Sequence, residues 1–130
     1  MVRIALLVAV VASLAVVVSA SSADQRRVAS YCSPSGDVCY GIFDVRGVIR
    51  FQLTTAARYF SRYRICVRTP RGATTCKRFP VRKTGASFGG KVIWQRNFPS
   101  GGPGRYRVTW KLGANRLGPS LTFRAPSQAA

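Results

Sequence analysis

Apolar and polar residues alternate along several short segments between residue 38 and the C-terminal end of the chain. The pattern is clearest where Ile49, Phe51 and Leu53 interleave with Val48, Arg50 and Gln52. Because successive side chains of a strand point to opposite faces, this period of two predicts strands with one face against a core. The predicted strands are Val38–Val45, Val48–Thr54, Ser61–Arg68, Thr74–Val81, Lys91–Phe98, Arg105–Leu112 and Ser120–Ala125.

Turn-forming residues separate these strands, and no long segment has helical periodicity. A single turn of helix within Thr55–Phe60 is compatible with the pattern. About seven strands at such spacing are typical of an all-β fold in which two antiparallel sheets pack face to face. All the aromatic residues lie after residue 23, where they are available to fill the core between the sheets.

The stretch Gly47–Arg124 also carries motifs of a known architecture. The segment Gly104-Arg105-Tyr106-Arg107-Val108-Thr109-Trp110, the closing strand Leu121-Thr122-Phe123 and the Tyr63–Val67 strand with its Pro-Arg-Gly hairpin resemble an immunoglobulin-like or fibronectin-like sandwich. The resemblance implies an immunoglobulin-like two-sheet antiparallel β-sandwich, with Tyr106 in a tyrosine corner. The cysteines depart from the antibody pattern, in which one disulfide joins the two sheets.

The N-terminus has the features of a secretory signal peptide. Arg3 supplies a positive charge, Ile4–Val18 is apolar except at one serine, and small residues allow cleavage after Ala20 or Ala23. The alternative is an uncleaved membrane anchor, since the apolar run approaches the ~20 residues that span a bilayer. We therefore expect a secreted, extracytoplasmic protein whose only membrane contact is through this segment, if it is uncleaved.

The expected organisation has four parts. They are a signal peptide at 1–23, a disulfide-closed N-terminal segment at 24–46 that joins the sandwich, a sandwich body at 47–125, and a flexible tail at 126–130.

The four cysteines of an exported chain predict two disulfides. Cys66 and Cys76 flank a Pro-Arg-Gly turn, and Cys32 and Cys39 bracket a Ser-Pro-Ser-Gly turn. Among the three connectivities, these turns favour pairing within each hairpin. The alternative of a zinc site with four cysteine ligands expects pairs only two to four residues apart.

Familiar catalytic chemistry lacks its residues in this sequence. There is no His and no Glu, and the three acids are Asp24, Asp37 and Asp44. A Ser–His–Asp or Cys–His site cannot be assembled, and Asp37 and Asp44 are interpreted as solvated structural acids paired with arginine. We therefore expect no enzyme activity, no metal site and no cofactor.

One glycine-rich segment partly matches a phosphate-binding loop. Gly85–Lys91 fits the first seven positions of that motif, but Val92 stands where Ser or Thr would bind magnesium. The residues that follow read as a strand, where the motif requires a helix. We therefore interpret the segment as a loop between strands, with no nucleotide cofactor.

Charge is the strongest remaining signal, with 21 Lys and Arg against 3 acids and a net charge of +18. Strand parity predicts that several arginines share one outer sheet face, whereas Arg71 and Arg116 are expected in turns. The candidate polyanion-binding residues are Arg62, Arg64, Arg68, Arg78, Arg105, Arg107 and Arg124.

Two functions are compatible with this pattern. The first is a non-catalytic extracytoplasmic module that binds an anionic cell-envelope polymer or another polyanion, because the guanidinium fork matches phosphate and carboxylate oxygens. The second is a structural or protein-interaction immunoglobulin-like domain with a protein partner, in which the charge reflects composition and solubility.

Overall fold

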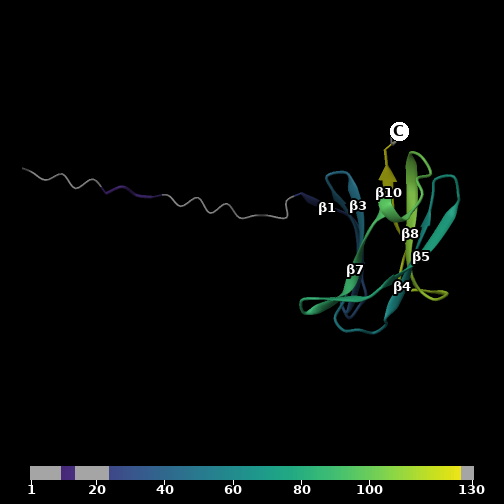
Figure 1. The fold of residues 1–130 in the computed structure, drawn as a ribbon, viewed down its shortest axis with the longest axis horizontal. Helices are drawn as coiled ribbons and strands as arrows, with labels where there is room; N and C mark the ends of the chain where they lie inside the picture. Colours follow the sequence, from purple (N-terminus) through teal and green to yellow (C-terminus); the bar gives the residue numbers. More distant parts are fainter. Residues whose placement is uncertain (1–9, 14–23, 127–130) are drawn as a thin grey trace, which may run out of the picture.

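The computed structural model describes residues 10–13 and 24–126. The predicted cleavage positions after Ala20 and Ala23, and the last four residues of the predicted tail, lie outside this part. The described part contains ten strands and one short helix (Figure 1). Their bounds are β1 Gln25–Cys32, β2 Val38–Val45, β3 Val48–Thr55, β4 Arg62–Arg68, β5 Thr74–Pro80, β6 Arg82–Thr84, β7 Ser87–Ile93, α1 Trp94–Asn97, β8 Gly104–Leu112, β9 Asn115–Arg116 and β10 Leu121–Ala125.

The strands form two antiparallel sheets. The first, sheet A, has the order β1-β2-β3-β7-β6, and the second, sheet B, has the order β10-β8-β4-β5, with β9 paired to β8. In Figure 1, β1, β3 and β7 lie on one side of the molecule and β10, β8, β4 and β5 on the other. The predicted all-β sandwich of two antiparallel sheets is therefore confirmed.

The core lies between the sheets, on the inner faces predicted from the alternation. On β3, Phe51 is fully buried, and on β8, Trp110 is fully buried and stacks on Tyr40 of β2 at 4.4 Å between ring centroids. Burying such a side chain contributes about 1.5–3 kcal/mol to folding. The other inward residues of β3, β4, β8 and β10 are Ile49, Leu53, Tyr63, Ile65, Val67, Tyr106, Val108, Phe123 and Ala125.

Tyr106 ties the start of β8 to the loop before it. Its hydroxyl donates a hydrogen bond to the carbonyl oxygen of Gly102 at 2.6 Å and accepts one from the amide of Gly101 at 2.9 Å. This is the contact expected for the tyrosine corner. It satisfies a buried hydroxyl and fixes where β8 begins.

The main difference from the predicted strands lies in the segment predicted as Lys91–Phe98. Strand β7 begins earlier, at Ser87, and ends at Ile93, after which α1 forms a single helical turn. Trp94 and Phe98 are both buried and lie four residues apart, so their spacing fits a helical turn as well as an alternating strand. The interpretation of Gly85–Lys91 as a loop was wrong, because most of it belongs to β7.

Two close approaches explain the glycines in β7. A Cβ atom placed on Gly89 would lie 1.8 Å from the carbonyl oxygen of Leu53, and its φ of 157° is one that other residues rarely adopt. Glycine inside a strand often marks such an approach. Gly90 faces the other way, because a Cβ there would meet the ring and hydroxyl of Tyr63 in β4. The Gly-Gly pair thus reflects contact with β3 at Gly89 and with the opposite sheet at Gly90.

Three strands were not predicted, so the count of about seven was too low. Strand β1 lacks a clean alternation because a bulge between Arg27 and Ala29 shifts its register. Strands β6 and β9 have only three and two residues. No helical turn forms within Thr55–Phe60, where β3 ends and bends follow.

Candidate functional site

The outer face of sheet B carries a dense set of cations. Each of the seven arginines singled out from the sequence lies at an outward position of β4, β5, β8 or β10, and all are exposed except Arg64, which is half-buried. Two further cations join them, Lys111 on β8 and Arg116 on β9. We call this set the cationic face: Arg62, Arg64, Arg68, Arg78, Arg105, Arg107, Lys111, Arg116 and Arg124.

Sequence reasoning missed the two additional cations for different reasons. Lys111 shares the parity of Arg105 and Arg107 along β8, so the same alternation could have identified it. Arg116 was expected in a turn, but it pairs with Lys111 in β9. No local signal marks a two-residue strand, whereas Arg71 does lie in the turn between β4 and β5.

The strand register places like charges directly opposite one another. Arg64 lies opposite Arg78 on one side and Lys111 on the other. Arg68 lies opposite Arg107 in the same sheet, and Arg105 opposes Arg124. Directly opposed residues have Cβ atoms about 4.5–5.5 Å apart, at which like charges destabilise a sheet.

No carboxylate relieves this repulsion within the part of the chain that the structure describes. The three acids all lie at or near β1 and β2 in sheet A, and the two ion pairs found there join Arg26 to Asp44 and Arg46 to Asp24. The interpretation of Asp44 as a structural acid paired with arginine is confirmed. For Asp37, the expected pairing is wrong: it is exposed and forms no ion pair with an arginine in the described residues, and its backbone amide donates to the hydroxyl of Ser35.

Shallow depressions run over the cationic face. The central one, of about 210 Å³, is lined by the Cys66–Cys76 disulfide, Thr109 and the cations Arg68, Arg107, Lys111 and Arg116. A neighbouring depression of about 280 Å³ shares Arg68 and Arg107 and extends to Arg105. A third, of about 160 Å³, is lined by Arg62, Arg64 and Arg78. Each of the three contains at least three of the cations.

Both predicted disulfides are present. Cys66 and Cys76 lie directly opposite each other in β4 and β5, with their Cα atoms 4.0 Å apart, and their bridge lies on the outer face of sheet B. Cys32 and Cys39 join β1 to β2 in the same manner. Two disulfides indicate that the chain folds in an oxidising, extracytoplasmic environment.

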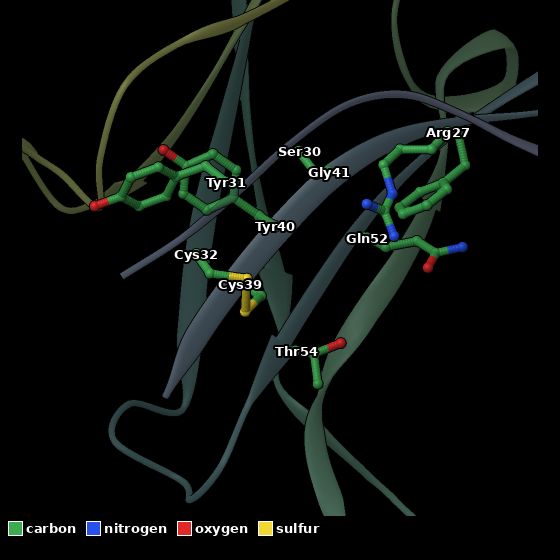
Figure 2. A pocket seen from close by; sticks show the side chains of 10 residues that line it. Arg27, Ser30, Tyr31, Cys32, Cys39, Tyr40, Gly41, Gln52 and Thr54 are labelled. Carbon is green, nitrogen blue, oxygen red and sulfur yellow. A yellow bond between two sulfur atoms is a disulfide. The ribbon is translucent and has the colours of Figure 1, made fainter. Parts of the chain in front are cut away.

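Another depression lies on the outer face of sheet A, around Gly41 of β2 (Figure 2). It measures about 170 Å³, and its polar lining includes Arg27, Gln52 and Thr54, with the Cys32–Cys39 disulfide at one side. Figure 2 shows Arg27 and Gln52 on one side of this region and Tyr31 with Tyr40 on the other. With a single cation, it offers much less charge than the cationic face.

The two described tyrosines whose pKa values are shifted do not lose their protons near neutral pH. Burial raises the pKa of both Tyr40 and Tyr63 to about 12, so each remains protonated. In the described ranges, no three potential ligands among His, Cys, Asp and Glu gather at one place. The arrangement on sheet B can attract and hold anions through guanidinium groups.

Comparisons with known proteins add no identity. The chain matches no protein-family model, no curated protein and no solved structure. In residues 10–13 and 24–126, no helix has the length and apolar character needed to cross a membrane.

Proposed function

We propose that this protein is a non-catalytic extracytoplasmic binding module whose cationic face associates with an anionic cell-envelope polymer or another polyanion. The observation that carries the proposal is the set of like-charged cross-strand pairs without a carboxylate in the described part of sheet B. A bound polyanion would neutralise charges that otherwise repel one another.

The distribution of charge supports a site more than composition alone does. Near β1 and β2 of sheet A, two arginines pair with acids, Arg26 with Asp44 and Arg46 with Asp24. On sheet B, nine cations share one surface, and three shallow depressions run between them. A chain that used arginine only for solubility would gain nothing from concentrating it opposite other arginines.

The experiment compares two double variants of the mature protein on immobilised inorganic polyphosphate at two salt concentrations. R64Q/R107Q removes two charges from the cationic face, and R82Q/R96Q removes two exposed charges from β6 and α1. We expect the first variant to weaken binding on the order of tenfold at low salt and to flatten its salt dependence. Equal weakening by both variants would mean that net charge alone drives binding.

The alternative is a structural or protein-interaction domain with an immunoglobulin-like order. One observation favours it: Phe43, Val45, Val48 and Ile93 are half-buried at outward positions of sheet A, where a protein partner would find apolar surface. A protein interface of this kind responds weakly to salt, so a partner retained at high salt would support the alternative.

Export is part of the proposal. The two disulfides require an oxidising compartment, and the signal peptide predicted for residues 1–23 would deliver the chain there. The intact mass of secreted material tests this step, with a mature N-terminus expected at Ser21 or Asp24. A product that keeps residues 1–20 in the membrane would favour an anchor instead.

A further inference from the structure

The cationic face is divided into two bands by an uncharged row. In that row, Cys66 lies opposite Cys76 on one side and Thr109 on the other. Toward one end of the strands lies the first band, made of Arg68, Arg105, Arg107 and Arg124. Toward the other end lies the second band, made of Arg62, Arg64, Arg78, Lys111 and Arg116.

The separation of the bands sets a length scale for the ligand. Arg64 and Arg68 lie four residues apart on β4, which at about 3.3 Å per residue separates their Cα atoms by roughly 13 Å. The bands meet at the central depression over the disulfide, which Arg68 and Arg107 line from the first band and Lys111 and Arg116 from the second. A small anion bound there leaves the outer cations of both bands without a ligand. A chain of linked anionic groups laid along the strands reaches both bands together.

The chemistry of the outward positions argues against a ligand with bases. Along β4, β5, β8 and β10, the outward residues are Arg, Lys, Thr, Cys and Pro, and the aromatic residues of these strands face inward. Proteins that bind single-stranded nucleic acid usually stack its bases on exposed aromatic side chains. Within the described residues, the cationic face has guanidinium and ammonium groups but no such aromatic side chain.

We infer that the ligand is a flexible, linear, base-free polyanion that lies along the strands of sheet B and contacts both bands. This inference rests on the proposed function and specifies its ligand class. The shared chemistry is a row of anionic oxygens on a flexible backbone, which phosphate polymers and acidic polysaccharides both provide. Binding through two bands raises affinity because the second contact is made within the same complex.

The test uses ligand length and paired variants of the mature, disulfide-bonded protein. The probes are tripolyphosphate, long-chain polyphosphate, polygalacturonate, and a single-stranded oligonucleotide with the same number of charges as the long polyphosphate. The variants are R68Q/R107Q for the first band, R64Q/R78Q for the second, and R82Q/R96Q as a control with the same loss of charge elsewhere. Binding is measured by calorimetry at fixed salt.

We expect long polyphosphate to bind at least on the order of a hundredfold more tightly than tripolyphosphate, and each band variant to remove most of that gain. The control should keep it. Polygalacturonate is expected to show the same dependence on both bands if carboxylates serve as well as phosphates, and binding of polyphosphate alone would assign the site to phosphate polymers.

Three outcomes would overturn the inference while leaving polyanion binding intact. One is equal affinity for short and long polyphosphate, with both band variants weakening both ligands, which would indicate one compact site over the disulfide. Another is that only one of the two band variants weakens the binding of long polyphosphate. The last is tighter binding of the oligonucleotide than of polyphosphate. If none of the polyanions binds, or if the control variant loses as much affinity as the band variants, the proposed function itself fails.

Discussion

The two sheets differ in how the charged side chains of neighbouring strands are matched. In sheet A, Arg26 lies opposite Asp44 and forms an ion pair with it. In sheet B, Arg64 lies opposite Arg78 with no acid nearby in the described part of the sheet. Part of the charge near β1 and β2 of sheet A is thus neutralised, whereas sheet B accumulates charge of one sign over four neighbouring strands.

In sheet B, the inner face of the strands supplies stability, and the outer face carries the proposed binding site. The inner face of sheet B buries Tyr106, Val108 and Trp110 completely, and this burial offsets the repulsion on the outer face. In sheet A, close fit matters on both faces: on the inner face a Cβ on Gly90 would meet the hydroxyl of Tyr63, and on the outer face a Cβ on Gly41 would lie 2.9 Å from the ring of Phe43. Sheet A should therefore be sensitive to shape, and sheet B to charge.

The largest effect is expected from a change of shape in sheet A. Gly89→Ala would drive a methyl group into the carbonyl of Leu53 and should lower the free energy of unfolding by at least about 3 kcal/mol. Gly85→Ala is the control, since it has a φ of 62° but no atom within 4 Å of the added Cβ, and should cost about 1–2 kcal/mol. Urea unfolding measures both, and equal losses would mean that the close approach does not limit sheet A.

Removing each disulfide in turn compares the two edge strands that the disulfides hold, β1 in sheet A and β5 in sheet B. Changing either cysteine pair to alanine opens a short loop, with sequence separations of 7 and 10, and should cost about 2–3 kcal/mol. The loss of Cys66–Cys76 should be larger at low salt, because repulsion on sheet B then acts on a free β5 edge. Hydrogen exchange should show β5 opening first; a loss of Cys32–Cys39 with the same salt dependence would contradict the comparison.

Tyr40 in sheet A and Tyr63 in sheet B are both buried, and among the described residues only one of these two hydroxyls has a hydrogen-bond partner. The hydroxyl of Tyr40 donates to the carbonyl of Pro119, whereas that of Tyr63 is buried without a partner in the described structure. Tyr40→Phe should cost about 1 kcal/mol, and Tyr63→Phe should be close to neutral. A larger loss for Tyr63→Phe would show that its hydroxyl has a partner, such as bound water.

The same two tyrosines predict how stability changes at high pH. Burial raises the pKa of each to about 12 in the folded protein, against an ordinary value of 10.0. The unfolded chain releases these protons first, so stability is intact below pH 10 and falls as the pH rises toward about 12. Denaturant midpoints across that range should fall less steeply in Tyr63→Phe than in the unaltered protein.

The smallest effects come from single charges on exposed positions. Arg26→Gln removes an attractive pair and should destabilise the fold by a few tenths of a kcal/mol, and Arg78→Gln removes a repulsive one and should stabilise it by about as much. Raising the salt concentration should shrink both effects. If Arg78→Gln destabilises the protein, the arginines of sheet B do not repel one another as their register implies.

The sequence predicts the inner faces well, because alternation reports directly which side of a strand is buried. Strand β2 was predicted with its observed bounds, and β3, β4, β5, β8 and β10 to within about a residue at each end. The disulfide pairs followed from turn chemistry. The placement of seven arginines on one sheet followed from the same parity, whereas their binding of polyanions remains a proposal.

The sequence by itself determined which side chains face inward, because parity along a strand is a local property of the backbone. It also determined the local disulfides, since each closes a turn marked by Pro and Gly. Tertiary structure alone decided that the bulged β1 joins sheet A, that β7 gives way to a helical turn at Trp94, and that Arg116 joins the cationic face. It also decided the register that sets arginine opposite arginine, because pairing between strands distant in sequence depends on how the two sheets fill their common core.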